Sequence, residues 1–417
     1  MNAGLATSPS AWSRFAPDPA LPHRDLLLDD QQMAARLALL INDRDAAVID
    51  RCEKQRIKYR VGESLRILYR LSVDGRTHLI AAKAFAVSES FERQSAQFVD
   101  PDIRAAFWVF PNDRKLRHLG LLREMPETLA TVLAGQWRDS ELVAYVPEKC
   151  ATVRCEDGDG NTIAYAKMHV AAEGPSLGET YLQLSSVCAN VVKPLEYSAR
   201  YQLLVLEAVP GNRISDLKSK ELSDGFAGLA QALAALHSAP IPNQLPRFRR
   251  HDPHRLRNCS RIIGMARPDV ATVADELDQE LRETIPAEES LVCLHGDVHP
   301  KNGIALPGLV TLIDLDQTGT GPAAADLGSM LALLHYNWRT GLISRRRQRE
   351  LARVFLQAYA GFRQLPAQRS LRWHMAAALL SERALRSVNR IRPEGLRHLS
   401  QLLNDAREIL RTGGVNS

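Results

Sequence analysis

The sequence predicts an α+β fold in two lobes, because the first half of the chain has the pattern of strands and the second half the pattern of helices. Up to residue 210, short apolar stretches alternate with clusters of Gly, Pro, Asn and Asp, which is typical of antiparallel strands and turns. From residue 217 onward, apolar residues recur at helical spacing over long stretches. A chain of 417 residues is long enough for two or three packed units.

The N-terminal part of the chain combines a tail, a helix and a set of strands. Residues 1–24 are rich in Ala, Ser and Pro and are predicted to be a disordered tail. Asp29 and Asp30 are placed to cap a helix that runs to Ile41. The dipeptide Asp74-Gly75 strongly favours a hairpin turn. Strands are predicted around this turn and beyond it, at 56–59, 65–73, 79–85 and 106–110.

This pattern then partly repeats. Strands are predicted at 142–145, 151–154 and 162–169, with turn residues at 157–160. The third strand of each set ends in a similar motif, Ile80-Ala81-Ala82-Lys83 and Ala164-Tyr165-Ala166-Lys167. The repeat indicates either a duplicated three-stranded element or two similar hairpins that arose by chance, and the sequence leaves both open.

The remaining elements complete the two lobes. A helix is predicted at 177–187, strands at 192–195 and 202–206, and further helices at 225–237, 271–283, 347–363, 369–391 and 396–410. We therefore divide the chain into a tail (1–24), an extra N-terminal α+β domain (25–138), a strand-rich N-lobe with its hinge (139–210) and a helical C-lobe (211–417). The extra domain is interpreted either as a cap over the site or as a dimerisation element.

Two short apolar runs lead into polar motifs within the helical half. Residues 291–294 precede His295-Gly296-Asp297-Val298-His299-Pro300-Lys301-Asn302, and residues 309–313 precede Asp314. We expect two buried strands that deliver Asp297 and Asp314 to one edge of a sheet. Phosphoryl transfer uses such a set, in which one carboxylate accepts the proton of the attacking hydroxyl while an Asn and an Asp hold Mg²⁺. Asn302 follows Asp297 by five residues, the spacing found in the catalytic loop of protein kinases.

With Asp326-Leu327-Gly328 and the segment 203–211, these motifs resemble the aminoglycoside phosphotransferase and choline kinase-like family, from about residue 142 to the C-terminus. The resemblance implies a two-lobed protein-kinase-like fold and an enzyme that phosphorylates a small-molecule hydroxyl. It further implies that Asp297 is the catalytic base and that Asn302 and Asp314 hold Mg²⁺. Asp326 is implied to orient the catalytic loop through His295.

The resemblance also implies the nucleotide site, with ATP as the expected donor and GTP as the alternative. Lys167 is the lysine expected to hold the nucleotide phosphates, and it is favoured over Lys83 because a helix, two strands and the hinge follow it directly. Glu179 is the candidate ion-pair partner of Lys167. The backbone from Glu207 to Val209 is expected to meet the adenine.

Several side chains keep two interpretations open. Asp316 is either a further metal contact or a carboxylate outside the ligand set. His299 is favoured as a structural loop residue, and His251 and His254 are favoured as surface residues over a metal pair. The family's Gly-rich phosphate loop is missing, so the side chain of Lys149 or backbone N–H groups beside it are expected to meet phosphate instead.

The possible acceptors include sugars, sugar-like compounds, amino alcohols and aminoglycosides. The charge of the C-terminal part of the chain favours some of these over others. Residues 327–417 contain 16 Arg, no Lys and five acidic residues, a net charge of +11. A polycationic aminoglycoside is repelled by such a surface, so the sequence favours a neutral or anionic acceptor. The alternative is that an acidic run lines the pocket; its members are Asp275, Glu276, Asp278, Glu280 and Glu283.

Other classes of function are less favoured. A nucleotide-binding pseudokinase without turnover is the main alternative, and it is disfavoured because every expected catalytic side chain is present. Nucleic-acid binding is disfavoured because the C-terminal arginines alternate with Leu and Ala at helical spacing, as on the outer faces of helices. Six scattered cysteines indicate reduced thiols and a cytoplasmic protein, and no stretch is apolar enough to span a membrane. The sequence does not determine the oligomeric state.

Overall fold

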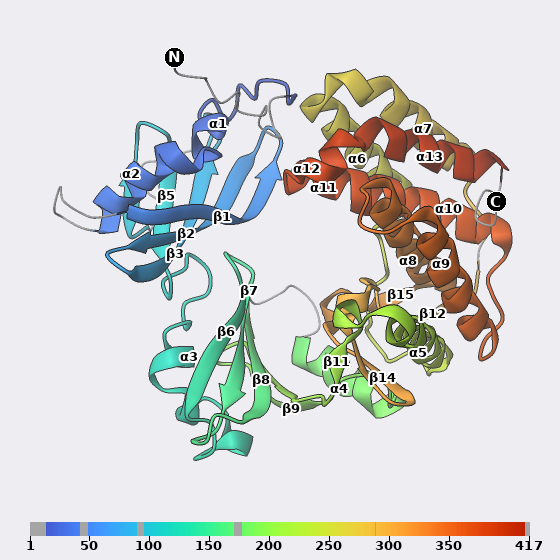
Figure 1. Cartoon of the computed structure of the whole chain (residues 1–417), viewed down its shortest axis with the longest axis horizontal. Helices are drawn as coiled ribbons and strands as arrows, with labels where there is room; N and C mark the ends of the chain where they lie inside the picture. The colour runs from blue at the N-terminus through green and yellow to red at the C-terminus, as the bar shows by residue number, and fades with distance from the viewer. Residues whose placement is uncertain (1–13, 42–48, 90–95, 171–176, 288, 413–417) are drawn as a thin grey trace.

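The computed structural model describes residues 14–41, 49–89, 96–170, 177–287 and 289–412. In Figure 1 two β-sheets lie one below the other, and the helical part of the chain lies beside both. The α+β class is therefore confirmed, and the extra N-terminal sheet is present.

The first sheet has five antiparallel strands in the order β1-β2-β3-β5-β4. Its strands are β1 (Ile49–Arg60), β2 (Ser64–Val73), β3 (Arg76–Phe85), β4 (Phe98–Asp100) and β5 (Ala105–Val109). The predicted helix is α2 (Asp30–Ile41), and the Asp29 carboxylate caps it by accepting hydrogen bonds from the backbone N–H groups of Gln31 and Gln32, at 2.9 and 3.0 Å. β1 begins seven residues earlier than predicted. Charged residues at its start replace the alternation of apolar and polar side chains by which a strand is predicted.

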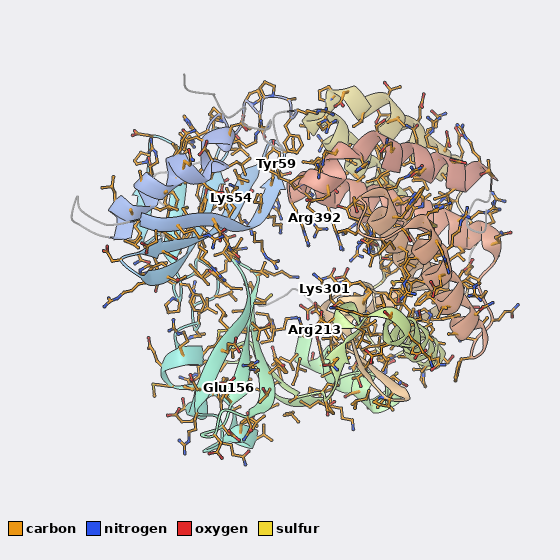
Figure 2. The ribbon with its side chains drawn as sticks, in the orientation of Figure 1. Lys54, Tyr59, Glu156, Arg213, Lys301 and Arg392 are labelled. Atoms are coloured by element: carbon orange, nitrogen blue, oxygen red, sulfur yellow. The ribbon has the colours of Figure 1, made fainter. Side chains whose placement is uncertain are left out.

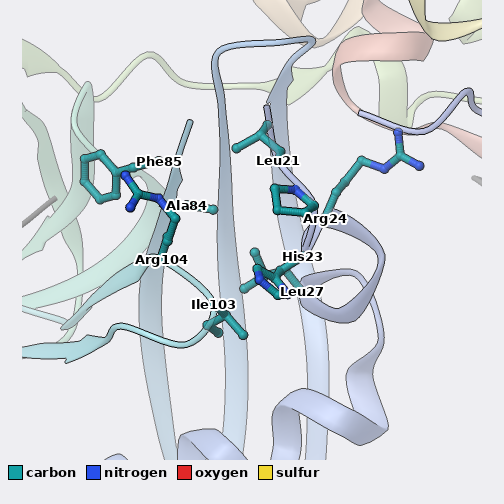
Figure 3. A pocket seen from close by; sticks show the side chains of 9 residues that line it. Leu21, His23, Arg24, Leu27, Ala84, Phe85, Ile103 and Arg104 are labelled. Atoms are coloured by element: carbon teal, nitrogen blue, oxygen red, sulfur yellow. The ribbon is translucent and has the colours of Figure 1, made fainter. Parts of the chain in front are cut away.

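The prediction of a tail as far as residue 24 was wrong for the described residues 14–24. Phe15 and Leu21 are buried, and the segment continues into α1 (Arg24–Leu27). Residues 21–27 pack against the end of β3 and leave a cavity of only about 10 Å³, which Figure 3 shows. Such a space holds at most one water molecule, so we interpret it as a packing defect of the core. Residues 1–13 lie outside the described part of the chain.

The second sheet repeats the topology of the first, with the order β6-β7-β8-β10-β9. Its strands are β6 (Asp139–Val146), β7 (Cys150–Glu156), β8 (Thr162–His169), β9 (Pro194–Ser198) and β10 (Leu203–Glu207), and α4 (Leu177–Val187) lies between β8 and β9. The register matches as well, since Arg66 faces Lys83 in the first sheet and Thr152 faces Lys167 in the second. Lys83 and Lys167 therefore occupy equivalent places.

An aspartate that precedes the first sheet holds the turn between β1 and β2. The Asp18 carboxylate accepts hydrogen bonds from the Tyr59 hydroxyl at 2.7 Å and from the Gly62 N–H at 2.9 Å. Phe15, three residues before this aspartate, stacks on Tyr59 with ring centroids 5.9 Å apart. Gly62 has a positive φ of 74°, a conformation that glycine adopts without strain.

The turn between β6 and β7 is held in the same way. The Asp113 carboxylate accepts hydrogen bonds from the Tyr145 hydroxyl at 2.7 Å and from the Glu148 N–H at 2.9 Å. Phe110, three residues before Asp113, packs on Tyr145 with ring centroids 5.1 Å apart. Glu148 has a φ of 59° where the first sheet has a glycine. Matched topology, register and turn contacts favour a duplication over two hairpins that are similar by chance.

The segment between the two sheets packs with the second one. It contains the short helix α3 (Leu121–Glu124), and the side chains of Leu119, Leu122 and Trp137 are fully buried. These residues share an apolar cluster with both sheets, including Trp108 of β5 and Val153 of β7. The two sheets are therefore joined through a common core.

The helical part follows β10. Its helices are α5 (Ser219–Ser238), α6 (Pro253–Ala266), α7 (Ala271–Glu283), α8 (Ala323–Arg339), α9 (Arg345–Ala360), α10 (Gln368–Ala378), α11 (Leu385–Asn389), α12 (Pro393–Arg397) and α13 (Leu399–Thr412). The helix predicted at 369–391 is α10 and α11 joined by a π-helical stretch, Leu379–Ala384. The first sheet reaches this part where β1 contacts α11 (Figure 1).

The prediction that one sheet edge carries both motifs was wrong. β12 (Leu291–Leu294) pairs with β15 (Gly319–Pro322), whereas β14 (Leu309–Leu312) pairs with β13 (Gly303–Leu306), which also pairs with β11 (Asn212–Arg213). Apolar runs show that the strands are buried, but they do not show which strands pair.

The six cysteines are free thiols. Within the described ranges, no helix has the length and apolarity needed to cross a membrane.

Candidate functional site

The loop that follows β12 is anchored by Asp326, which lies in the first turn of α8. The buried carboxylate accepts hydrogen bonds from the backbone N–H of His295 at 2.7 Å and of Gly296 at 2.9 Å. His237 of α5 lies 3.1 Å from the same carboxylate. Gly296 has a φ of 76°, and a Cβ there would lie 2.0 Å from the carbonyl oxygen of Gln317, so only glycine fits. This geometry is what the predicted anchoring role of Asp326 requires.

Asn302 ties the loop to the strand that leads to Asp314. Its side-chain Nδ2 donates to the carbonyl oxygen of Asp297 at 3.0 Å, and its own carbonyl oxygen accepts from the N–H of Ile313 at 2.9 Å. The ring of His295 adds a second link, because its Nε2 lies 3.0 Å from the carbonyl oxygen of Ile313. Three residues predicted to act together, Asp297, Asn302 and Asp314, are thus brought to one place although two different sheets carry them.

The donor set at this place suits Mg²⁺. Because Nδ2 of Asn302 is the donor to Asp297, its Oδ1 is left as an acceptor, and Asp314 supplies carboxylate oxygens from a left-handed backbone conformation with φ 59°. In the part of the chain that the structure describes, no three His, Cys, Asp or Glu side chains form a metal cluster. A site with two protein ligands that the nucleotide phosphates complete is the arrangement Mg²⁺ commonly takes.

Lys167 of β8 bridges the carboxylates that follow β14. Its Nζ lies 2.8 Å from Asp314 Oδ1 and 2.6 Å from Asp316 Oδ1. Burial opposes ionisation of Asp314, yet the ammonium of Lys167 lowers the pKa of that carboxyl below its ordinary value. Tyr181 of α4 braces the group, since its hydroxyl accepts from the N–H of Leu315 at 2.8 Å and lies 3.3 Å from Asp316. A cation is therefore already favoured between these two carboxylates.

The structure places Lys83 in a different environment. Its Nζ lies 3.4 Å from Glu89 and 4.0 Å from the centroid of the Phe85 ring. The lysine that reaches the predicted metal ligands is thus Lys167, which favours it for the phosphate role. Glu179 lies with an exposed side chain on α4, the helix that also carries Tyr181, and its pairing with Lys167 stays a prediction.

The hinge prediction concerns the end of β10. Glu207 is the last residue of this strand, and its carboxylate accepts from the N–H of Lys193 at 2.9 Å. Val209 follows with a half-buried side chain. Their contact with adenine stays a prediction.

Asp297 faces a cation. Its Oδ1 lies 3.2 Å from the guanidinium of Arg386 on α11, and its Oδ2 lies 3.7 Å from Nε2 of His299. Burial would raise the pKa of Asp297, but Arg386 and then His299 and Arg250 lower it below its ordinary value. Burial also lowers the pKa of His299 to about 4, so this histidine is neutral at neutral pH. Asp297 is thus a carboxylate able to accept a proton.

The prediction that His251 is a surface residue was wrong, whereas His254 is exposed as predicted. His251 is buried, with Nδ1 2.9 Å from Nδ1 of His374 and Nε2 3.5 Å from the carboxylate of Glu382. The physical reason is that the segment before α6 folds onto α10, which the sequence pattern of α6 did not reveal. Through Glu382, the pair is linked to Arg250, which donates to the carbonyl oxygen of Gly296 in the loop that carries Asp297.

Sequence reasoning missed three further residues around the loop that carries Asp297: Arg250, Glu382 and Arg386. Arg250 donates to the carbonyl oxygen of Gly296 at 2.7 Å and to Glu382 at 3.0 Å. Glu382 lies in the π-helical stretch, and its carboxylate is buried. A π-turn inside a helix is often found at a functional site, but the arginine-rich sequence around it looks like the outer face of an ordinary helix.

The turn between β6 and β7 stands where the Gly-rich phosphate loop was expected. Its N–H groups at Glu148 and Lys149 already donate to Asp113 and to Val146, at 2.9 and 3.0 Å. The Glu148 carboxylate accepts two hydrogen bonds from Arg114, at 2.8 and 2.9 Å, and lies 3.2 Å from Arg66 of the first sheet. The exposed side chain of Lys149 is therefore favoured over the backbone N–H groups as the contact for a nucleotide phosphate.

Glu148→Gln is expected to lower the free energy of unfolding by about 2 kcal/mol. Burial opposes its ionisation, but Arg114 and Arg66 lower the pKa of Glu148, and a neutral amide would leave two partly buried guanidinium groups without a counter-charge. Urea unfolding measures the change. The matched control is Glu141→Gln, which removes an exposed ion pair with Arg154 and should cost less than about 0.5 kcal/mol. Equal losses in the two variants would contradict the role of Glu148.

Comparisons with known proteins identify the family. The model of the phosphotransferase enzyme family matches residues 166–374, half of the chain. Among solved structures, the chain is similar to a choline/ethanolamine kinase family protein from Mesorhizobium loti, at 14% identity and a TM-score of 0.48, covering 69% of this chain and 96% of that chain. No curated protein matches the chain.

Two further solved structures are similar. One is choline kinase from Cryptosporidium parvum, at 12% identity and a TM-score of 0.49, covering 66% of this chain and 91% of that chain. The other is an aminoglycoside phosphotransferase from Streptomyces rimosus, at 21% identity and a TM-score of 0.43, covering 58% and 92%. The family match, which starts in β8 and ends in α10, confirms the resemblance predicted from the motifs: the chain belongs to the phosphotransferase enzyme family and is a small-molecule kinase of that family.

Proposed function

We propose that this kinase transfers the γ-phosphoryl group of ATP to a hydroxyl of a small molecule, with Asp297 as the base and Asn302 and Asp314 as the Mg²⁺ ligands. The observation that carries the proposal is the double link made by Asn302. Its side chain bonds the backbone of Asp297, and its backbone bonds the residue before Asp314. A proton acceptor and two oxygen ligands are thereby held together, as phosphoryl transfer requires.

In the proposed reaction the acceptor hydroxyl gives its proton to the Asp297 carboxylate as its oxygen bonds to the γ-phosphorus. The bond from that phosphorus to the oxygen bridging the β-phosphate breaks, and ADP leaves with the electron pair. Bound Mg²⁺ supplies charge neutralisation at the phosphates. Lys167 exchanges its contact with Asp314 for a phosphate oxygen and keeps its contact with Asp316, and Arg386 keeps Asp297 ionised before the proton arrives.

A neutral or anionic acceptor fits the charges better than a polycation. The acidic run on α7, which was the alternative lining for the pocket, is engaged elsewhere. Arg407 of α13 contacts Glu276 and Glu280, and Arg282 contacts Asp278 at 3.0 Å. These carboxylates therefore form ion pairs with arginines of α7 and α13. The carboxylate of Asp297, the proposed base, faces Arg386.

We further propose that the extra N-terminal domain, residues 25–138, acts as a cap. Two contacts support this interpretation over a dimerisation element. β1 contacts α11, the helix that carries Arg386. Arg66 contacts Glu148 in the turn before β7, the strand that pairs with the strand of Lys167. Figure 2 shows Tyr59 of β1 and Arg392 beside α12 where the first sheet meets the helical part.

The test is ADP release measured with Mg²⁺ and ATP or GTP across sugars, sugar phosphates, sugar acids, amino alcohols and aminoglycosides. We expect release that depends on one acceptor class, stops when EDTA removes the metal, and returns with added Mg²⁺. Fast, saturable turnover of an aminoglycoside would overturn the charge argument. Tight nucleotide binding without turnover of any acceptor would favour the pseudokinase instead.

A further inference from the structure

A cavity of about 260 Å³ opens beside the loop that carries Asp297. Four arginines line it, namely Arg247, Arg249, Arg250 and Arg255, together with Asp316 and Thr318. The volume is at the small end for ligand pockets, which suits one compact group of a ligand better than an extended chain.

The pocket is strongly cationic. Its one carboxylate, Asp316, is already paired with Lys167 at 2.6 Å, and Arg250 is paired with Glu382 at 3.0 Å. Among the described residues, no carboxylate lies within ion-pair distance of Arg247, Arg249 or Arg255. Guanidinium groups bind carboxylates and phosphates through paired hydrogen bonds, so three unneutralised arginines at one cavity favour an anion.

A buried hydroxyl provides a second, independent observation. Thr318 lines the cavity with only 4% of its surface exposed, and its Oγ1 has no hydrogen-bond partner among the described residues. A buried polar atom normally has a partner, because leaving it without one costs about 1–3 kcal/mol. This oxygen is closed off from the open space, so an anion in the cavity reaches the Thr318 donor only when the side chain turns toward it.

The pocket is rigidly joined to the catalytic loop. The N–H of Phe248 donates to the carbonyl oxygen of Thr320, and the N–H of Thr320 donates to that of Pro246, each at 2.8 Å, so the arginine segment is paired with β15. Arg250 donates to the carbonyl oxygen of Gly296 at 2.7 Å and lies 3.3 Å from the side chain of Gln317. The wall of the pocket therefore touches the residue immediately before Asp297.

We infer that this arginine pocket binds an anionic group of the acceptor, so that the protein phosphorylates a hydroxyl compound that already carries a phosphate or a carboxylate. The inference rests on the proposed function and narrows its acceptor to an anion. The anionic group, held by Arg247, Arg249 and Arg255, orients the molecule so that one of its hydroxyls meets Asp297. Neutral sugars lack this contact, and aminoglycosides are repelled by it.

The kinetic test compares acceptors that share one skeleton and differ in charge: a neutral sugar, the corresponding sugar acid and the corresponding sugar phosphate. The variants are Arg249→Gln and Arg255→Gln, with Arg353→Gln on the exposed face of α9 as the matched control. We expect KM for the preferred anionic acceptor to rise about tenfold in each pocket variant, the effect of losing one charge-assisted contact. KM for ATP should stay within about twofold, because neither arginine contacts Lys167. Preference between the acid and the phosphate identifies the anionic group.

A binding measurement that needs no turnover separates this inference from the proposed function. Inorganic phosphate should raise the Tm of the wild-type protein and of Arg353→Gln, and raise it less in Arg249→Gln and Arg255→Gln. Equal shifts in all four proteins, or a neutral sugar turned over as well as its phosphate, would overturn the pocket assignment while leaving the kinase intact. Loss of the phosphate effect in the pocket variants without turnover of any acceptor would support the anion site and refute the proposed reaction.

Discussion

Asp297→Asn is expected to lower kcat about 1000-fold, the scale of a lost general base, while the affinity for ATP stays within about twofold. An amide has nearly the shape of the carboxylate, but it does not accept the proton of the acceptor hydroxyl. Arg386 lowers the pKa of Asp297 although burial opposes it, so the wild-type carboxylate is ionised at neutral pH and the full loss should appear there.

Steady-state ADP release measures this loss, and nucleotide titration measures the affinity separately. The matched control is Asp278→Asn, which removes a buried carboxylate paired with Arg282 on α7 and leaves the loop intact. Its kcat should stay within about twofold of the wild type. If Asp297→Asn kept a tenth or more of the wild-type kcat, Asp297 would not be the base.

Asp326→Ala is expected to lower the free energy of unfolding by about 4 kcal/mol, because each buried donor left without a partner costs about 1–3 kcal/mol. The carboxylate accepts from two backbone N–H groups, at His295 and Gly296, and contacts His237. The remaining folded protein should also show a kcat about 100-fold lower, since a small displacement of the loop misplaces Asp297.

Urea unfolding and kcat, measured where each variant is folded, separate the two effects. Asp405→Ala is the control, because this carboxylate is also buried and also has several partners, here the side chains of His335 and Arg339, but it lies between α13 and α8. It should be destabilised to a similar extent with an unchanged kcat. A parallel loss of kcat in Asp405→Ala would mean that Asp326 acts through stability alone.

The elements that the sequence predicted to the residue are those whose signal is local. β8, α4 and α7 begin and end where the apolar pattern and the flanking turn residues placed them. The motif from His295 to Asn302 is local in the same sense, since one short loop holds Asp297, the proposed base, and Asn302, a proposed Mg²⁺ ligand. Its resemblance to a family could therefore be recognised, and the family match confirms it.

Elements with a different environment were missed. α8 is buried on nearly every side from Ala323 to Ala332, so its residues show no polar face and no helical period. α6 shows the opposite problem, because arginines separate its buried Leu256, Cys259 and Ile263. The signal was present at helical spacing, but the charged residues between these positions hid it.

By itself, the sequence determined the α+β class, the family and the motif from His295 to Asn302, since these depend on short-range patterns and spacing. Only the tertiary structure decided which partners those residues meet. Lys167 reaches Asp314 across 147 positions, and Arg386 reaches Asp297 across 89. The arginine pocket likewise joins residues 246–255 to residues 316–319. Charge pairing and strand pairing over such separations depend on the packing of the whole chain, which no local pattern records.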